Sequence, residues 1–292
     1  MVVWNLLFFT ILLPLVAIAL LWRRPRQPAA RWAATLVLAA GIAGFSVLAA
    51  PWGWFGVPLR FVIALLFAVA VVMSLRNQPQ PEDPPTSPFR ILLMALIGMF
   101  FGVVAIGVLR AHRVPFGAVD VGFPLVRGTY LVAQGGSEPA ANIHAQHPAQ
   151  RYAVELVKLN AAGMRARGIY PNDAKAYAIF GETVVSPCDG TAVAATDAFP
   201  DAARISLDEK NPLGNHVTLR CGDTDVTLAH LQRGSVVVRT GSSVTRGTPL
   251  GRVGNSGTST EPHLQIHAER NGAGVPLRFD GRWLVRNALI RK

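Results

Sequence analysis

Four long apolar runs fill the first part of this chain and restrict its fold more than any other feature. They lie at about residues 2–22, 33–50, 56–75 and 91–109 and contain almost no charge. Each is close to the roughly 20 residues that a membrane-spanning helix needs. The first run has no basic start and no small-residue cleavage site after it, which is not the pattern of a cleaved signal peptide. We therefore expect residues 1–110 to form an anchor of four transmembrane α-helices.

The arginines between the runs predict the orientation of this anchor. Short loops rich in Lys and Arg stay in the cytoplasm. The loops after the first and third runs are the basic ones, with Arg23, Arg24, Arg26, Arg31, Arg76 and Arg90. The segment between the second and third runs, PWGWFGV, has no charge, and Arg60 at the outer edge of the third run is the exception. The pattern predicts a multi-pass protein of the inner (cytoplasmic) membrane, with residues 111–292 in the periplasm or its extracytoplasmic equivalent.

The net charge of +11 does not indicate a nucleic-acid partner. Residues 1–110 hold eight Arg against Glu82 and Asp83, and membrane topology accounts for that excess. The rest of the chain keeps a modest balance of +5, which suits a solvated basic surface or an anionic polymer. The runs have no interior Asp, Glu, Lys or His, so a solute pathway through the helices is not expected. The partner expected for these four helices is membrane lipid.

Beyond Arg110 the pattern changes to short alternating segments separated by turn residues. We expect residues 111–140 to connect the anchor to a β domain at 141–292. The predicted strands are 151–160, 181–187, 190–197, 215–221, 225–231, 235–241, 248–254 and 263–270. Residues 162–178 fit a short helix or an irregular insertion. The fold class predicted is therefore four transmembrane helices followed by an all-β, antiparallel extracytoplasmic domain.

Two cysteines, Cys188 and Cys221, lie at the edges of predicted strands in this domain. An oxidising compartment permits a disulfide between them. Neither lies in a basic or helix-opening context that would lower its pKa. A structural disulfide is therefore expected in preference to a cysteine nucleophile.

Histidines gather in three segments of the same domain. The segments supply His144, His147 and Glu155, then His230, then His263 and His267. In a strand, His263, Gln265 and His267 all point to one face because they are two residues apart. His112 and His216 are interpreted as ordinary surface or core histidines. Histidines and a carboxylate from separate strands are the usual donors of a catalytic zinc site.

Several segments resemble the lysostaphin-type, or LytM-type, zinc endopeptidases, which cut peptide cross-links in bacterial cell walls. The resemblance covers roughly residues 141–285. It rests on SPCDGTAV, GNHV, LAHLQRGSVVVRTGSSVTRGTPLGRVGNSG and STEPHL. It implies a β-sheet domain that acts on the peptide stems of peptidoglycan, with Zn²⁺ as its cofactor.

The resemblance also assigns roles to individual residues. His144 matches the first zinc ligand, Glu155 stands where the family has Asp, and Gln265 stands where the third ligand should be a histidine. His230 and His263 match the two histidines that assist catalysis. His147 remains an alternative to His144, and His267 an alternative to Gln265 if a bulge brings it into range.

The function predicted is that of a membrane-anchored zinc metalloendopeptidase acting on the cross-links of peptidoglycan. A neutral amide is a weak ligand for zinc where imidazole is a good one. The alternative is therefore a zinc-deficient, non-catalytic module that binds peptidoglycan or activates a hydrolase, with a cell-wall hydrolase or division protein as partner. Gln265 is the residue that discriminates between these two hypotheses.

Overall fold

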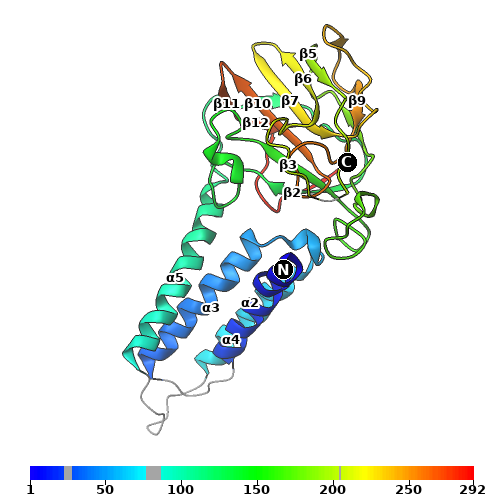
Figure 1. The fold of residues 1–292 in the computed structure, drawn as a ribbon. Coiled ribbons are helices and arrows are strands. Elements are labelled where there is room, and N and C mark those ends of the chain that lie inside the picture. The colour runs from blue at the N-terminus through cyan, green and yellow to red at the C-terminus, as the bar shows by residue number, and fades with distance from the viewer. Residues whose placement is uncertain (23–27, 77–86, 204) are drawn as a thin grey trace. The chain divides into compact units, whose positions relative to one another are not determined.

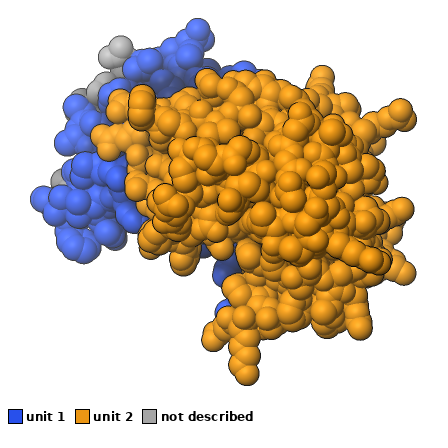
Figure 2. All heavy atoms as spheres, turned by 90° about the horizontal axis from the view of Figure 1, so that it is seen from above, with its two compact units in different colours: residues 1–109 blue, residues 110–292 orange. Residues whose placement is uncertain are grey.

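The computed structural model describes residues 1–22, 28–76, 87–203 and 205–292. The chain divides into two compact units, residues 1–109 and 110–292, which Figure 2 colours separately. The arginines predicted to orient the anchor at 23, 24 and 26, and the acidic pair Glu82 and Asp83, lie outside the described residues.

Helices make up the first unit (Figure 1). They are α1 (Val2–Leu7), a π-helical turn η1 (Phe8–Leu12), α2 (Leu13–Trp22), α3 (Ala29–Ala49), the short 3₁₀ turn η2 (Trp52–Trp54), α4 (Leu59–Leu75) and α5 (Pro88–Arg110). Proline marks the beginning of α3, α4 and α5, at Pro28, Pro58 and Pro88. Proline at a helix start costs nothing, because its missing N–H would have no intrahelical partner there.

Three helical stretches are long and apolar enough to cross a membrane, namely Val2–Trp22, Ala29–Ala49 and Pro88–Arg110. The fourth predicted span, 56–75, is a shorter apolar helix of 17 residues, α4. Its length at 1.5 Å per residue is about 26 Å, close to the hydrocarbon thickness of a bilayer. Four N-terminal helices are therefore present, and three of them have full spanning length.

Glycine allows two of these helices to approach closely. A Cβ atom added to Gly41 in α3 would meet the carbonyl oxygen of Gly98 in α5, and one added to Gly98 would meet the carbonyl oxygen of Val37. Small residues at a helix crossing are typical of membrane helices, where close backbone packing replaces the hydrophobic effect. The long apolar side chains on the rest of α5 are exposed, for example Phe100 and Val103, as expected for contact with lipid.

Strands make up the second unit. Its main sheet has the order β14-β2-β3-β10-β7-β6-β5-β8, with β11 paired to β10, and all of its pairs are antiparallel. The strands are β2 (Thr129–Gln134), β3 (Val154–Leu159), β5 (Gly190–Thr196), β6 (Asn215–Cys221), β7 (Thr224–Leu231), β8 (Ser243–Val244), β10 (Leu264–Arg270), β11 (Ala273–Val275) and β14 (Leu289–Arg291). The smaller sheets contain β1 (Val119–Val121), β12 (Leu277–Phe279) and β13 (Arg282–Trp283), and β4 (Thr183–Val185) with β9 (Pro249–Arg252). An antiparallel β domain thus follows the helices.

One face of the main sheet carries the hydrophobic core. Leu264 and Ile266 of β10, Leu228 of β7, Leu219 of β6 and Leu156 of β3 are fully buried in it. The alternation of side chains along each strand sends the residues between them to the opposite face. That opposite face is the polar one and holds the candidate site.

Two segments differ from their predictions. Residues 111–140 were expected to be a connection, but β1 and β2 lie there and pair into the sheets, so the unit begins at Arg110. The strand predicted at 235–241 does not form. Its apolar alternation instead reflects Val236 and Val238, which pack against the core while Val237 N–H donates to Leu250 O.

Two further features of the second unit are a disulfide and an irregular insertion. Cys188 and Cys221 form a disulfide with their Cα atoms 6.0 Å apart, which ties the start of β5 to the end of β6. Residues 160–182, between β3 and β4, form an irregular insertion whose regular part is the 3₁₀ turn η4 (Ala174–Ala176). Its two sides meet at the bridge between Ala166 and Tyr177.

Candidate active site

Strand β10 places three polar side chains on the polar face of the sheet. Gln265 pairs with Glu155 of β3 on one side and with Ala229 of β7 on the other. His263 immediately precedes β10, and His267 follows two residues after Gln265. All three are buried, with exposures of 5%, 4% and 4% for His263, Gln265 and His267. Central position and burial make this strand the floor of the site.

A bulge in β7 turns His230 toward the same face. Leu228 pairs with Val217 and Leu231 with Asn215, so β7 holds one residue more than β6 between these pairs. His230 has φ of 62°, the left-handed region that non-glycine residues seldom adopt. Regular alternation would send His230 into the core beside Leu228. The bulge lets Leu231 enter the core while His230 faces the site.

The 3₁₀ turn η3 (Ile143–Gln146) carries His144. Its position depends on the buried Asn142, whose side-chain oxygen accepts a hydrogen bond from His144 N–H. The amide nitrogen of Asn142 donates to the carbonyl oxygens of Gly136 and Ala153, both at 3.0 Å. Asn142 therefore fixes an irregular turn to the edge of β3, beside Glu155.

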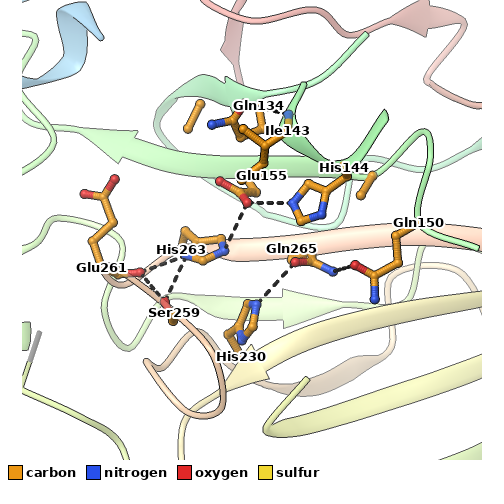
Figure 3. Close-up of polar contacts among 12 residues, drawn as sticks. Gln134, Ile143, His144, Gln150, Glu155, His230, Ser259, Glu261, His263 and Gln265 are labelled. Carbon is orange, nitrogen blue, oxygen red and sulfur yellow. Dashed lines mark hydrogen bonds and ion pairs between the residues drawn. The ribbon is translucent and has the colours of Figure 1, made fainter. Parts of the chain in front are cut away.

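Glu155 is the centre of the cluster (Figure 3). Its Oε1 lies 2.7 Å from His144 Nε2 and 3.8 Å from His263 Nε2. Burial by itself would raise the pKa of this carboxyl group. The surrounding histidines, above all His263 and then His144, outweigh burial and lower the pKa to about 2. Glu155 is therefore a carboxylate throughout the physiological pH range.

Backbone carbonyl oxygens orient two of the histidine rings. His263 Nδ1–H donates to Glu261 O at 2.8 Å, and His230 Nδ1–H donates to Ser256 O at 2.8 Å. His263 Nε2 lies 3.8 Å from Glu155 Oε1 and is buried without a hydrogen-bond partner among the described residues. Burial, followed by the charge on His263, lowers the pKa of His230 to about 3, so His230 is neutral at pH 7.

Gln265 occupies the space between His230 and a second glutamine. Its side-chain amide lies 3.3 Å from His230 Nε2 and 3.2 Å from Gln150 Oε1. It also approaches His267 Nδ1 at 3.5 Å. Gln150, Gln265 and His230 thus form one chain of contacts (Figure 3).

A cavity of about 470 Å³ is lined in part by the connected side chains of Gln150, Gln265 and His230. Its lining residues are His144, His147, Pro148, Ala149, Gln150, Pro212, Leu213, His230, Thr258 and Gln265. This volume lies within the usual range of small-molecule and peptide sites. The cavity is lined by histidine and glutamine side chains and by short apolar side chains, a surface that suits a peptide segment.

A buried ion pair supports the segment that carries His263. Arg165, from the irregular insertion, pairs with Glu261, and both side chains are largely buried. Burial raises the pKa of Glu261, although the neighbouring Arg165 opposes that shift. The hydroxyl group of Tyr170, from the same insertion, donates to Thr260 O at 3.3 Å. The insertion therefore holds residues 260–261, and the carbonyl group of Glu261 orients His263.

Most of the predicted site residues come together. His144, Glu155, His230, His263 and Gln265 form one cluster. His147 lines the cavity, with its ring centroid 6.5 Å from that of His144. His267 contacts Gln265. Sequence reasoning missed Gln150, Asn142, Arg165 and Glu261, because single polar residues in irregular segments carry no periodic signal.

The family of the domain follows from its sequence. The sequence model of Peptidase family M23 matches residues 173–276. This chain carries a domain of peptidase family M23. The match covers the strands from β4 to β11 and confirms the resemblance to lysostaphin-type enzymes. The family acts on peptidoglycan and is typically zinc-dependent. Among curated protein sequences, none matches.

Solved structures of similar proteins include a zinc-containing peptidase from Vibrio cholerae, with 17% identity, a TM-score of 0.33, and coverage of 52% of this chain and 37% of that one. Helicobacter pylori Csd3 has 18% identity, a TM-score of 0.33, and coverage of 60% and 35%. The catalytic domain of lysostaphin from Staphylococcus simulans has 18% identity, a TM-score of 0.28, and coverage of 53% and 85%. The chain thus spans little more than a third of the first two structures.

The residues that the resemblance places at the zinc-ligand positions do not fit a zinc ion as they stand. His144 and Glu155 offer one imidazole and one carboxylate, which contact each other at 2.7 Å, whereas a catalytic zinc site uses three protein ligands. The third position offers the amide of Gln265, which His230 and Gln150 already contact. In the described part of the chain, no three His, Cys, Asp or Glu side chains form a group that could hold one metal ion.

Proposed function

We propose that this protein is a membrane-anchored M23 domain that binds the peptide stems of peptidoglycan without cleaving them. The observation that carries the proposal is the set of contacts made by the Gln265 side chain. Its amide stands at the third ligand position and is engaged by His230 and Gln150. A hydrogen-bonded amide is a poor substitute for imidazole as a zinc ligand, and two protein ligands are fewer than catalytic zinc sites use.

The cavity supports a binding role in its own right. Peptide ligands are held by a few fixed polar groups within a largely apolar lining. Gln150 and His230 supply such groups, and Pro212 and Leu213 supply apolar contacts. Because the polar groups are already hydrogen-bonded to the protein, little ordering is needed on binding. The groove is therefore built to receive a neutral peptide segment.

The helices supply the anchor. Arg31, Arg76 and Arg90 flank the apolar helices on the side where the chain is basic, and the rule for basic loops assigns that side to the cytoplasm. With four spans, the M23 domain lies outside the cytoplasm, where peptidoglycan is found. A disulfide between Cys188 and Cys221 is compatible with that compartment.

A second candidate is a zinc endopeptidase. The convergence of His144, Glu155, His230 and His263 on one point favours it, because those four residues match the rest of the M23 machinery. Gln265 is the residue that opposes it. The two candidates differ in whether cell-wall material is released.

Co-sedimentation with insoluble peptidoglycan tests the proposal. The full-length protein in detergent should sediment with the cell-wall material and release no soluble fragments. Thr258→Trp places a large ring in the cavity that Thr258 lines and should reduce the bound fraction about tenfold, the loss of roughly 1.4 kcal/mol. Thr240→Trp, at an exposed position outside the cavity, is the matched control and should bind like the unmodified protein.

Two results would contradict the proposal. Release of soluble peptides by the unmodified protein, stopped by a chelator, would establish the endopeptidase. Equal sedimentation of Thr258→Trp and Thr240→Trp would remove the cavity from the binding site.

A further inference from the structure

A second cavity lies next to the first and is not explained by the M23 machinery. Its volume is about 300 Å³, at the lower end of the range for ligand sites. Its lining residues are Thr196, Phe199, Lys210, Asn211, Pro212, Leu213, Gly214 and His216. Pro212 and Leu213 line both cavities. One segment of chain therefore separates two neighbouring hollows.

That shared segment is rigidly held. Pro212 O accepts a hydrogen bond from Thr258 N–H, and Leu213 O accepts one from His230 N–H. Gly214 has φ of 56°, and a Cβ atom there would lie 2.4 Å from the backbone of Ser256, so only glycine fits. The wall between the cavities is thus tied to the residues of the first site.

An aromatic side chain lines the second cavity in a fixed position. The backbone of Phe199 is held on both sides by Asn215, whose Oδ1 accepts from Phe199 N–H and whose Nδ2 donates to Phe199 O, both at 2.8 Å. Asn215 itself is fully buried. The backbone of Phe199 is therefore held in place, and its side chain lines the cavity together with Leu213 and Pro212.

Two polar side chains of the second cavity, His216 and Lys210, can still form a hydrogen bond or an ion pair with a ligand. His216 donates from Nδ1 to Gly214 O at 2.8 Å, which leaves Nε2 as an acceptor. The ammonium group of Lys210 makes no ion pair with a carboxylate of the described residues. The nearby carboxylate of Asp208 is instead engaged by the backbone N–H groups of Lys210 and Asn211 and by the Asn211 side chain. The cavity thus combines a cation, an acceptor and an apolar wall.

We propose that the second cavity binds the carboxyl-terminal residue of a peptide whose preceding residues occupy the first cavity. Lys210 pairs with the terminal carboxylate, His216 Nε2 accepts from the last peptide N–H, and Phe199 and Leu213 contact a small aliphatic side chain. This inference rests on the proposed function and adds a specificity to it, for stems that end in a free carboxylate.

Calorimetric titration of the full-length protein in detergent tests this inference. The probes are a synthetic stem pentapeptide that ends in D-alanine and its C-terminal carboxamide. The unmodified protein should bind the free acid about tenfold more tightly, which is the size of one charge-assisted contact. Lys210→Met should bind both probes with the weaker affinity. Lys175→Met, which removes an exposed lysine of the irregular insertion, should keep the preference.

The outcomes separate the two proposals. Equal binding of both probes by the unmodified protein would overturn the second subsite and leave the first cavity as a peptide site. A preference that survives in Lys210→Met would also overturn it. Binding of neither probe would overturn the proposed function together with the subsite.

Discussion

The two faces of β10 are equally buried and are stabilised by different interactions. Leu264 and Ile266 have no exposed surface and contact the hydrophobic core. Gln265 and His267, each 4% exposed, lie instead on the polar face of the sheet. Contacts of the first face are apolar, and those of the second are hydrogen bonds to glutamine and histidine. Burial alone therefore does not tell which residues of a strand stabilise the fold and which form its binding surface.

The difference between the two faces of β10 shows how side chains on the polar face can change without loss of the fold. A core side chain is fixed by the volume around it, whereas a polar residue on the groove face is fixed by one or two partners. Gln265, at the position where the resemblance implies a ligand histidine, is compatible with the sheet because Gln150 and His230 contact its amide. The same strand can therefore keep its fold while the chemistry of its other face is altered.

The largest effect expected is on the core face. Ile266→Ala should destabilise the β domain by about 3 kcal/mol, since a fully buried aliphatic side chain is removed and a cavity remains. Gln265→Ala should cost about 1 kcal/mol, the usual net value of a hydrogen bond. Hydrogen exchange of the β10 amides measures both changes. Equal losses of protection in the two variants would break the distinction between the faces.

A second effect is expected from acid, through the buried histidines of the polar face. Burial holds the folded-state pKa of His267 at about 4 and that of His230 at about 3, below the unfolded value near 6.5. As pH falls from 7 to 5 the unfolded chain takes up protons that the folded chain rejects, so stability should fall by about 1–2 kcal/mol per histidine. The stability is fully present above the unfolded pKa and declines as pH falls toward the folded values.

The unfolding midpoint measured against pH checks this expectation. His267→Gln removes one titrating group. The fall in the unfolding midpoint between pH 7 and 5 should therefore be smaller by the contribution of that histidine. His112→Gln changes a histidine outside the groove and serves as the control. An unchanged pH profile in His267→Gln would mean that His267 is not held neutral in the folded protein.

Much of the fold could be predicted from the sequence. The long apolar runs determine the helices, because almost uninterrupted apolar segments of that length have few other stable structures. Alternation predicted β6, β7 and β10 nearly to their ends. β2 was missed because its Tyr130-Leu131-Val132 run is buried on both sides and so does not alternate. The segment 235–241 alternates but packs on the core without a ladder, which periodicity cannot distinguish from a strand.

The site was less predictable than the fold. The common face of His263, Gln265 and His267 follows from strand geometry. The direction of His230 does not, because regular alternation would send it into the core and the bulge reverses that. His216 was interpreted as an ordinary histidine, yet it lines the second cavity beside Phe199. Phe199 and Lys210 lie in an irregular segment whose path no local pattern encodes.

The central claim is that Gln265 leaves the cluster of His144, Glu155, His230 and His263 without a third zinc ligand. The most direct test is zinc stoichiometry in the full-length protein and in Gln265→His, each dialysed against a weak chelator and analysed by atomic absorption. The account predicts no retained zinc in the unmodified protein and close to one zinc per chain in Gln265→His, where His144, Glu155 and the new imidazole supply three ligands. Stoichiometric zinc in the unmodified protein, or none in Gln265→His, would contradict it.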